Sequence, residues 1–373
     1  MTDRDALFAR LRRRPDVEDA TLLAHDASDA LILDEAARLR KQLGEVVVIG
    51  DRHGALTLGA LHDGAEHVRA HQDSIVGERA LDANAAELGP VGAGGFTHHR
   101  LDASLVEGAT LVLLQLPRAL DELDEIAELI ATHADEQVRV VAGGRVKHMT
   151  MSMNALLGRS FRHVHASRGW RKSRVLHAEG PRRPGISWPR TRRHALLGRQ
   201  QSVVAHGGAF AGTAVDIGAQ TLLAHLDDMA DASHAIDLAC GTGVLGIALA
   251  LARPELQVLA TDASAAAIAS TRASANANGV ADRVDARQLD GLEGVPDASA
   301  GLILLNPPFH LGATVHTGIA ERLIADAGRA LAPGGELWCV WNTPLGYRPL
   351  LERVGETRQA SRTPKFTVTV TTR

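Results

Sequence analysis

The chain has 373 residues, which is long for a single domain and favours two. Hydrophobic residues make up 45% of the chain, so it can bury sizeable cores, and this excludes disordered and fibrous proteins. The net charge of −4 argues against a protein that binds nucleic acids over its whole surface, and two distant cysteines argue against a disulfide framework or a zinc site.

The N-terminal residues show no targeting signal. Residues 1–10 (MTDRDALFAR) lack an apolar core followed by a cleavage site, which argues against a signal peptide. No apolar run approaches the roughly 20 residues that span a bilayer. We therefore expect a soluble, cytoplasmic protein with no membrane partner.

A series of segments in the first half of the chain returns in the second half. Residues 46–56 (VVVIGDRHGAL) align with 235–245 (AIDLACGTGVL), and residues 111–117 (LVLLQLP) align with 302–308 (LILLNPP), at offsets of 189 and 191 residues. A shorter match lies between these segments, at residues 71–74. Three segments in register indicate two copies of one unit.

Both copies alternate apolar strands with helical stretches, which predicts the α/β class: two tandem Rossmann-like domains, each a mainly parallel twisted sheet covered by helices. We expect a first domain over 1–179, a basic connector over 180–195 and a second domain over 196–373. In the second domain we expect strands near 234–239, 256–261, 283–288, 301–306 and 335–341, and helices near 218–229, 243–252, 264–278 and 317–331.

The two copies differ at the positions where the chemistry of a binding site would matter. Arg52 replaces Gly241, and its side chain would obstruct a backbone that must approach a ligand closely. Gln72 replaces Asp262. We therefore expect the first domain to be degenerate, with a role other than catalysis.

A basic segment ends the first copy. Residues 159–193 contain eleven Lys or Arg and one acidic residue, Glu179, and Phe161, Trp170 and Trp188 lie among them in a chain with only 3% aromatic residues. Guanidinium groups for phosphates beside rings for bases suit RNA. The predicted RNA-binding residues are Arg168, Trp170, Arg171, Lys172, Arg174, Arg192 and Arg193. The alternative is a solvated linker that happens to be basic.

The second copy opens with a strand and a glycine-rich turn. Residues 241–246 (GTGVLG) match the G-x-G-x-x-G pattern, and Asp262 follows Gly241 by 21 residues, where a ribose-binding acid is expected. A dinucleotide such as NAD would explain both features. Asp237 ahead of the glycines favours S-adenosylmethionine instead, because this carboxylate would repel a pyrophosphate and attract a cationic methionine end. The predicted cofactor-binding residues are Asp237, Ala239, Gly241, Gly243, Asp262, Ala263, Asp290 and Asn306.

Two of these acids have specific expected roles. Asp262 would accept the two ribose hydroxyls, and Asp290, after the following strand, would accept the adenine amino group. The alternative for Asp237 and Asp262 is helix or turn capping, and Asp290-Gly291 is also an ordinary turn.

A rigid polar motif, Asn306-Pro307-Pro308-Phe309, ends the apolar strand near 301–306. The Asn306 side chain and the Pro307 carbonyl would accept the two hydrogens of a conjugated amino group and aim its nitrogen at a methyl donor. The prolines hold the loop, and Phe309 would stack on a base. These four are the predicted catalytic residues.

The scattered histidines lack ligand spacing, and we expect no metal. The acceptor stays open among adenine N6, guanine N2 and a glutamine amide, and the alternative for the motif is a tight turn.

These motifs resemble those of the bacterial two-domain ribosomal RNA guanine-N2 methyltransferases, a family of class I S-adenosylmethionine-dependent enzymes that modify small-subunit or large-subunit RNA. The resemblance covers nearly the whole chain. It rests on residues 210–219, 237–246 and 306–310 with Asp262, while 143–147 and 168–174 resemble the end of the family's first domain, slightly nearer the large-subunit type. One departure is Ala239, where many members have glycine, and we expect that position to be tolerant.

The resemblance implies that the first domain helps to bind RNA and the second transfers a methyl group from S-adenosylmethionine to N2 of a guanine in 16S or 23S ribosomal RNA. The partner would be ribosomal RNA or a ribosomal subunit precursor, and we expect a monomer. One alternative is methylation of adenine N6 or of a glutamine in a translation factor. An alternative of another class is a non-catalytic RNA-binding assembly factor, against which the intact Asp237, Asp262 and Asn306 argue.

Overall fold

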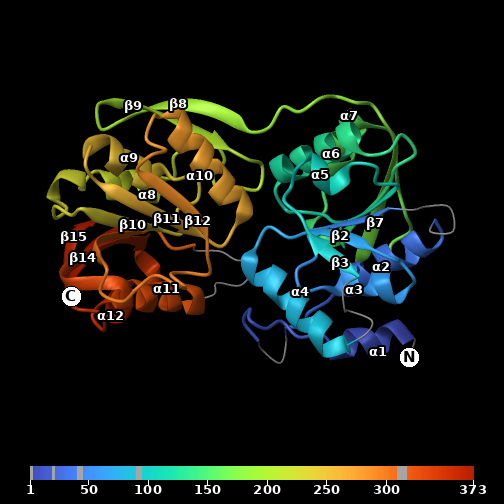
Figure 1. Cartoon of the computed structure of the whole chain (residues 1–373), viewed down its shortest axis with the longest axis horizontal. Coiled ribbons are helices and arrows are strands. Elements are labelled where there is room, and N and C mark those ends of the chain that lie inside the picture. Colours follow the sequence, from blue (N-terminus) through green and yellow to red (C-terminus); the bar gives the residue numbers. More distant parts are fainter. Residues whose placement is uncertain (1–2, 19–21, 40–44, 90–94, 309–316) are drawn as a thin grey trace. The chain divides into compact units, whose positions relative to one another are not determined.

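The computed structural model describes residues 3–18, 22–39, 45–89, 95–308 and 317–373 (Figure 1). The chain divides into two compact domains, Met1–Trp188 and Pro189–Arg373. The predicted connector, 180–195, is thus shared between them, with the change of domain at Trp188. Among the described residues, none of the helices is both long enough and apolar enough to cross a membrane.

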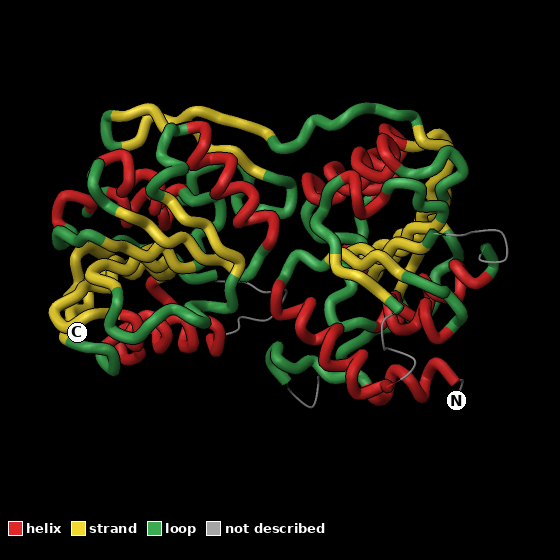
Figure 2. The backbone as a smooth tube through the Cα atoms, viewed as in Figure 1, coloured by secondary structure: helices red, strands yellow, loops and turns green. Residues whose placement is uncertain are grey.

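The first domain contains the strands β1 (Val46–Ile49), β2 (Val68–His71), β3 (Phe96–His98), β4 (Leu111–Gln115), β5 (Arg139–Arg145), β6 (Phe161–Ala166) and β7 (Ser173–Pro181). Its helices are α1 (Asp3–Arg10), α2 (Ala27–Ala37), α3 (Ala55–His62), α4 (Ile75–Leu88), α5 (Ala103–Val106), α6 (Leu120–His133) and α7 (Met151–Ser160), with a 3-10 turn at Val146–His148. The strand order is β3-β2-β1-β4-β5-β7-β6. Helices α1 to α4 share a core with one face of the sheet, and α5 to α7 with the other (Figure 2).

The second domain contains the strands β10 (His234–Leu238), β11 (Gln257–Asp262), β12 (Val284–Gln288), β13 (Ala300–Leu305), β14 (Leu331–Asn342), β15 (Glu356–Arg362) and β16 (Phe366–Thr372). Its helices are α8 (Ile217–Leu223), α9 (Val244–Ala252), α10 (Ala265–Ala277), α11 (Thr317–Ala330) and α12 (Arg348–Leu351), with 3-10 turns at Leu226–Asp228 and Thr343–Leu345. Helices α8 to α10 pack on one face of the sheet, and α11 and α12 on the other.

The second sheet repeats the first strand for strand. Its order is β12-β11-β10-β13-β14-β16-β15, which is the order of the first sheet with each strand replaced by its counterpart. The register is the same too: Val46 lies opposite Leu111 in the first sheet, and Ala235 lies opposite Leu302 in the second. These are the residues that the offsets of 189 and 191 align, so the predicted fold class and the duplication are confirmed.

The predicted elements of the second domain are present with small shifts at their ends. Strand β14 begins at Leu331, earlier than expected, and pairs with β13 through an irregularity between Ala300 and Leu302. The helix expected near 218–229 is shorter, because α8 ends at Leu223 and a 3-10 turn follows.

A hairpin, β8 (Arg190–Leu196) and β9 (Arg199–Ala205), precedes the second sheet and was not predicted. Its two-residue turn places Leu197 at φ 51° and Gly198 at φ 71°, the backbone that a tight hairpin requires. The other edge of β9 pairs with side chains of α10: Ser274 Oγ accepts from Val204 N at 2.9 Å and donates to Val204 O at 3.1 Å. Ser270 and Asn278, one helical turn away on either side, bond to His206 and Ser202. These side chains take the place of a neighbouring strand.

Candidate active site

The predicted cofactor and catalytic residues come together at the carboxyl ends of β10, β11 and β13. The chain leaves β10 toward β11 on one side and returns to β13 on the other side of β10, so β10 stands where the strand order reverses. Open α/β sheets bind ligands outside the strand ends at such a point. The fold therefore brings Asp237, the glycine turn, Asp262 and Asn306 to one edge of the second sheet.

The glycine turn between β10 and α9 has a run of left-handed residues. Ala239, Gly241 and Gly243 have φ values of 59°, 57° and 76°, and Gly243 is the N-cap of α9. Glycine adopts this backbone freely, whereas an alanine such as Ala239 carries a cost of about 1–2 kcal/mol. Apart from Gly241 and its two chain neighbours, no described residue has a heavy atom within 4 Å of the place where a Cβ of Gly241 would stand, so the turn exposes its backbone to open space.

Asp262 holds this turn in place. Its Oδ2 accepts from Gly241 N at 3.0 Å, and its Oδ1 accepts from Ser264 N at 2.9 Å. Each carboxylate oxygen has a second lone pair, so ribose hydroxyls would share these oxygens with the backbone amides. Ala263 lies between Asp262 and Ser264 in the sequence, and its carbonyl accepts a hydrogen bond from Gln288 Nε2 at 3.0 Å.

The Asp237 carboxyl is buried, with 1% of the residue exposed. Its Oδ2 accepts from Gly246 N at 2.8 Å in the first turn of α9, while its Oδ1 is buried and receives no hydrogen bond from the part of the chain that the structure describes. Burial raises its pKa to about 7, the bond from Gly246 opposes that rise, and repulsion from Asp262 adds to it. A cation placed beside Oδ1 would offset both the burial and the repulsion from Asp262, and so would favour the ionised carboxylate.

Asn306 follows β13, and its amide is oriented by a residue that the sequence analysis did not single out. Its Nδ2 donates to Asp216 Oδ2 at 3.1 Å. Its Oδ1 is buried and accepts no hydrogen bond from any described residue. Asp216 is the N-cap of α8 and also accepts from Ala219 N at 3.2 Å. The atom left unpaired is thus an acceptor, which is the group that a reacting amino nitrogen needs.

The remaining predicted site residues have different surroundings. Pro307 is buried and Pro308 is exposed, while Phe309 lies outside the described residues. Asp290 makes a two-pronged ion pair with Arg322 of α11, at 2.9 Å and 2.7 Å. An adenine amino group at Asp290 would therefore have to share this carboxylate with a guanidinium.

The residues present fit S-adenosylmethionine, which carries a sulfonium and an ammonium. The buried Oδ1 of Asp237, for which the described part of the chain offers no hydrogen-bond donor, would face a cation, and the open space at Gly241 allows a ligand to approach the backbone closely. Such buried polar atoms without partners are uncommon in folded proteins and require an explanation. In the first domain the oxygen that matches Asn306 Oδ1 has a partner, because Gln115 Oε1 accepts from Ser28 Oγ at 3.2 Å.

The predicted RNA-binding residues fall into two groups. Arg168, Trp170, Arg171 and Lys172 lie in the loop between β6 and β7, with Arg174 at the start of β7, and all five are exposed. Arg171 and Lys172 form the tip of a tight turn closed by Trp170 and Ser173, with φ values of 45° and 60°. The Arg171 guanidinium lies 4.5 Å from the centre of the Trp170 ring.

The second group, Arg192 and Arg193, lies on β8, where neighbouring side chains point to opposite faces. Phe161 and Trp188, which the sequence places among the arginines, are buried. The expectation that they form part of an RNA-facing surface is therefore wrong, and of the three rings only Trp170, 39% exposed, is available.

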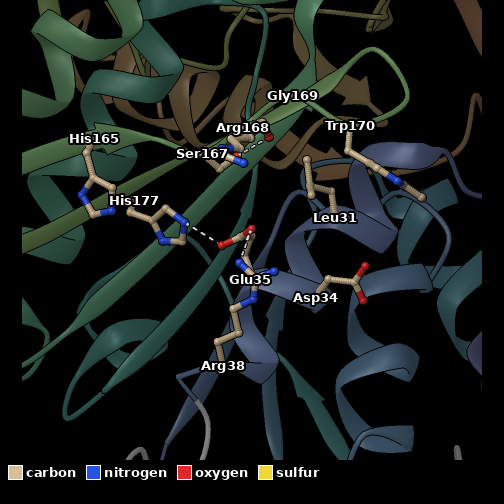
Figure 3. Close-up of a pocket in the computed structure, with 10 residues that line it drawn as sticks. All are labelled: Leu31, Asp34, Glu35, Arg38, His165, Ser167, Arg168, Gly169, Trp170 and His177. Atoms are coloured by element: carbon tan, nitrogen blue, oxygen red, sulfur yellow. Dashed lines mark hydrogen bonds and ion pairs between the residues drawn. The ribbon is translucent and has the colours of Figure 1, made fainter.

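Arg168 and Trp170 also line a cavity of about 590 Å³ in the first domain (Figure 3). Across it lie Asp34, Glu35 and Arg38, and Glu35 accepts from Arg38 and bonds to His177. Acidic and basic groups are mixed here, so the cavity is not a simple phosphate site.

Both domains of the chain match known protein families. A family described as "Methyltransferase small domain" matches residues 200–370, and one described as "RLMG N-terminal domain" matches residues 2–182. The chain is 36% identical to the "Ribosomal RNA large subunit methyltransferase G" of Streptomyces coelicolor over 96% of each chain, and 35% identical to that of Pseudomonas aeruginosa over 97% of each.

The fold is shared with a solved structure. The 16S rRNA N2 G1207 methyltransferase (RsmC) of T. thermophilus, in complex with AdoMet and guanosine, aligns with a TM-score of 0.76 and 22% identity over 92% of each chain. At that identity the likeness shows the fold alone, whereas the curated relatives show the family. The chain therefore belongs to the ribosomal RNA large subunit methyltransferase G family.

Proposed function

We propose that this protein transfers the methyl group of S-adenosylmethionine to N2 of a guanine in the ribosomal RNA of the large subunit. The observation that carries the proposal is the buried Oδ1 of Asn306, which has no hydrogen-bond partner among the described residues and is held beside the glycine turn by the end of β13. The family supports a ribosomal RNA acceptor over a glutamine in a protein. The presence of Asp237, Asp262 and Asn306 in the second domain supports an enzyme over a non-catalytic assembly factor.

The residues of the chain supply orientation and charge. When bound, S-adenosylmethionine provides an electrophilic methyl group on a sulfonium sulfur. Asp237 would neutralise the cationic charge of the cofactor, and Asp262, which holds the glycine turn, would also hold its ribose. The Asn306 Oδ1 atom and the Pro307 carbonyl accept the two hydrogens of the guanine amino group. Two fixed acceptors pull this conjugated nitrogen toward a tetrahedral geometry, so that its lone pair points at the methyl carbon.

The exposed loop of the first domain would bind the RNA. Arg168, Arg171, Lys172 and Arg174 offer cations to phosphates, and Trp170 offers a face to an unstacked base. Arg192 and Arg193 would add contacts from β8. The substrate would be ribosomal RNA or a precursor of the large subunit, which would place the protein in the cytoplasm, and the two domains would act together as a monomer.

The test is methyl transfer in vitro with purified protein, labelled S-adenosylmethionine, and 23S and 16S ribosomal RNA from cells that lack the gene. We expect label in N2-methylguanosine of 23S RNA. The substitution Asn306→Ala should lower the rate by about 100-fold or more and leave cofactor affinity unchanged in calorimetry. Gln115→Ala, at the matching position of the first domain, is the control and should retain the wild-type rate. A wild-type rate in Asn306→Ala would remove Asn306 from the mechanism.

A further inference from the structure

We infer that Asp216 is a positioning residue that orients the Asn306 carboxamide so that its oxygen, and not its nitrogen, faces the acceptor amine. The inference rests on the proposed function. The two ends of an amide have nearly the same shape, so sterics alone seldom decide which end points where. At Asn306 the Asp216 carboxylate sets the orientation of the amide, because a carboxylate oxygen accepts hydrogen bonds and cannot donate them.

The first support is the pairing around Asp216. Its Oδ2 receives Ala219 N at 3.2 Å and Asn306 Nδ2 at 3.1 Å. A reversed Asn306 amide would place Oδ1 against this oxygen, and two acceptors would then face each other. The reversed amide would also point an N–H₂ donor into the site, where the hydrogens of an amino group require acceptors.

The second support is the rigidity of the residues that hold Asp216. The start of α8 is fixed by Gln220, whose backbone N–H bonds to Asp216 O at 2.9 Å and whose side chain bonds to Val215 O at 2.8 Å. A Cβ on Gly218 would stand 2.8 Å from Asp216 Oδ2 and 3.2 Å from Asn306 Oδ1. A larger residue at 218 would push the Asp216 carboxylate out of this position, so glycine favours the contact.

The third support is the first domain, where the start of α2 also binds the matching amide through a carboxylate, but from a different position. Asp26 caps α2 as Asp216 caps α8, accepting from Ser28 N at 2.6 Å. Yet the matching amide, Gln115, bonds to Ser28 and Asp29 instead of Asp26. In both copies a carboxylate at the helix start receives the amide N–H, from the N-cap residue Asp216 in the second copy and from the N3 residue Asp29 in the first.

Two substitutions separate capping from orientation. Serine is a good N-cap but too short to reach Asn306, so Asp216→Ser keeps the helix start and frees the amide. The side-chain amide introduced by Asp216→Asn can still present one oxygen to both Ala219 N and Asn306 Nδ2. We expect Asp216→Ser to lower the single-turnover rate by about 10- to 100-fold with unchanged S-adenosylmethionine affinity. We expect Asp216→Asn to restore most of that rate. Asp26→Ser, the same change on α2, should leave the rate unchanged.

Three results would overturn the inference: a wild-type rate in Asp216→Ser, a loss of cofactor affinity that accounts for its slower rate, or an Asp216→Asn variant as slow as Asp216→Ser. A second readout does not depend on the acceptor. With ¹⁵N-labelled asparagine, the Asn306 side-chain amide should exchange slowly with solvent in the wild type and rapidly in Asp216→Ser. If the wild-type protein failed to methylate ribosomal RNA, the proposed function would fall, and the exchange measurement would still decide the role of Asp216.

Discussion

The Asp237 side chain is buried, and one of its oxygens accepts a hydrogen bond from Gly246 N. The other oxygen has no hydrogen-bond partner among the described residues. Its pKa in the folded protein is raised to about 7 from the ordinary 3.8. The folded protein therefore binds more protons than the unfolded chain between these values. For this group, stability is greatest at low pH and falls as the pH rises through about 7, because the carboxyl must then ionise inside the protein.

A bound cation reverses that cost, so cofactor affinity should depend on pH. We expect the affinity for S-adenosylmethionine to rise between about pH 6 and pH 8, with proton release on binding, and by at most about tenfold per pH unit. Calorimetry in two buffers of different ionisation enthalpy measures both effects. Asp237→Asn should bind more weakly and without this pH dependence. Equal affinity at both ends of the range, with no proton released, would show that Asp237 does not face the cation.

The chemical types of these residues were predictable, and their partners were not. Asp237 and Asp262 lie at or near the ends of their strands and Asn306 directly follows one, and the carboxyl ends of parallel strands meet at one edge. The contact of Asn306 with Asp216 joins residues 90 positions apart and depends on the exact place where α8 begins. Asp290 shows the same limit, because its pair with Arg322 requires the packing of α11.

At the scale of elements, the hairpin β8–β9 depends on side chains of α10 for its outer edge. Ser274 alone satisfies both the N–H and the carbonyl of Val204, a residue that is 6% exposed. An unsatisfied buried backbone group costs about 1–3 kcal/mol. The strands and helices of the second sheet were predictable from apolar runs and glycines. The hairpin was missed because β8 is mostly exposed and basic and shows no apolar alternation.

We therefore expect Ser274→Ala to lower the free energy of unfolding by about 1–3 kcal/mol. Hydrogen exchange should increase at Val204 before the sheet itself opens. Asn276→Ala, on the exposed side of the same helix, is the control and should change stability little. The two variants are compared by urea unfolding. An unchanged midpoint for Ser274→Ala would mean that α10 does not hold the hairpin.

At the scale of the whole molecule, charge is divided unevenly along a chain with a net charge of −4. Some of the basic residues of 159–193 are already engaged by groups of their own domain. Arg159 pairs with Asp124, and Arg182 and Arg183 donate to backbone carbonyls of their own domain. The proposed RNA-binding residues of this segment are those of the exposed loop, with Arg168, Arg171 and Arg174, and those of β8, Arg192 and Arg193. The duplication was predictable from the two sequence offsets, since both sheets keep one register.

Replacing Arg168, Arg171 and Arg174 with glutamine should weaken RNA binding and flatten its salt dependence. The slope of log K against log salt should fall by about 2, because each phosphate of single-stranded RNA that is no longer neutralised reduces it by about 0.7. Replacing Arg287, Arg348 and Arg353, which pair with acids on the second domain, changes the net charge equally and is the control. Equal effects of the two triple variants would assign the weaker binding to net charge and not to the loop.

The central claim is the reaction itself, and the most direct measurement is nucleoside mass spectrometry of 16S and 23S ribosomal RNA from cells with and without the gene. We predict that one N2-methylguanosine disappears from 23S RNA and returns when the wild-type gene, but not the Asn306→Ala gene, is restored. Unchanged N2-methylguanosine in 23S RNA, or a loss confined to 16S RNA, would contradict this account.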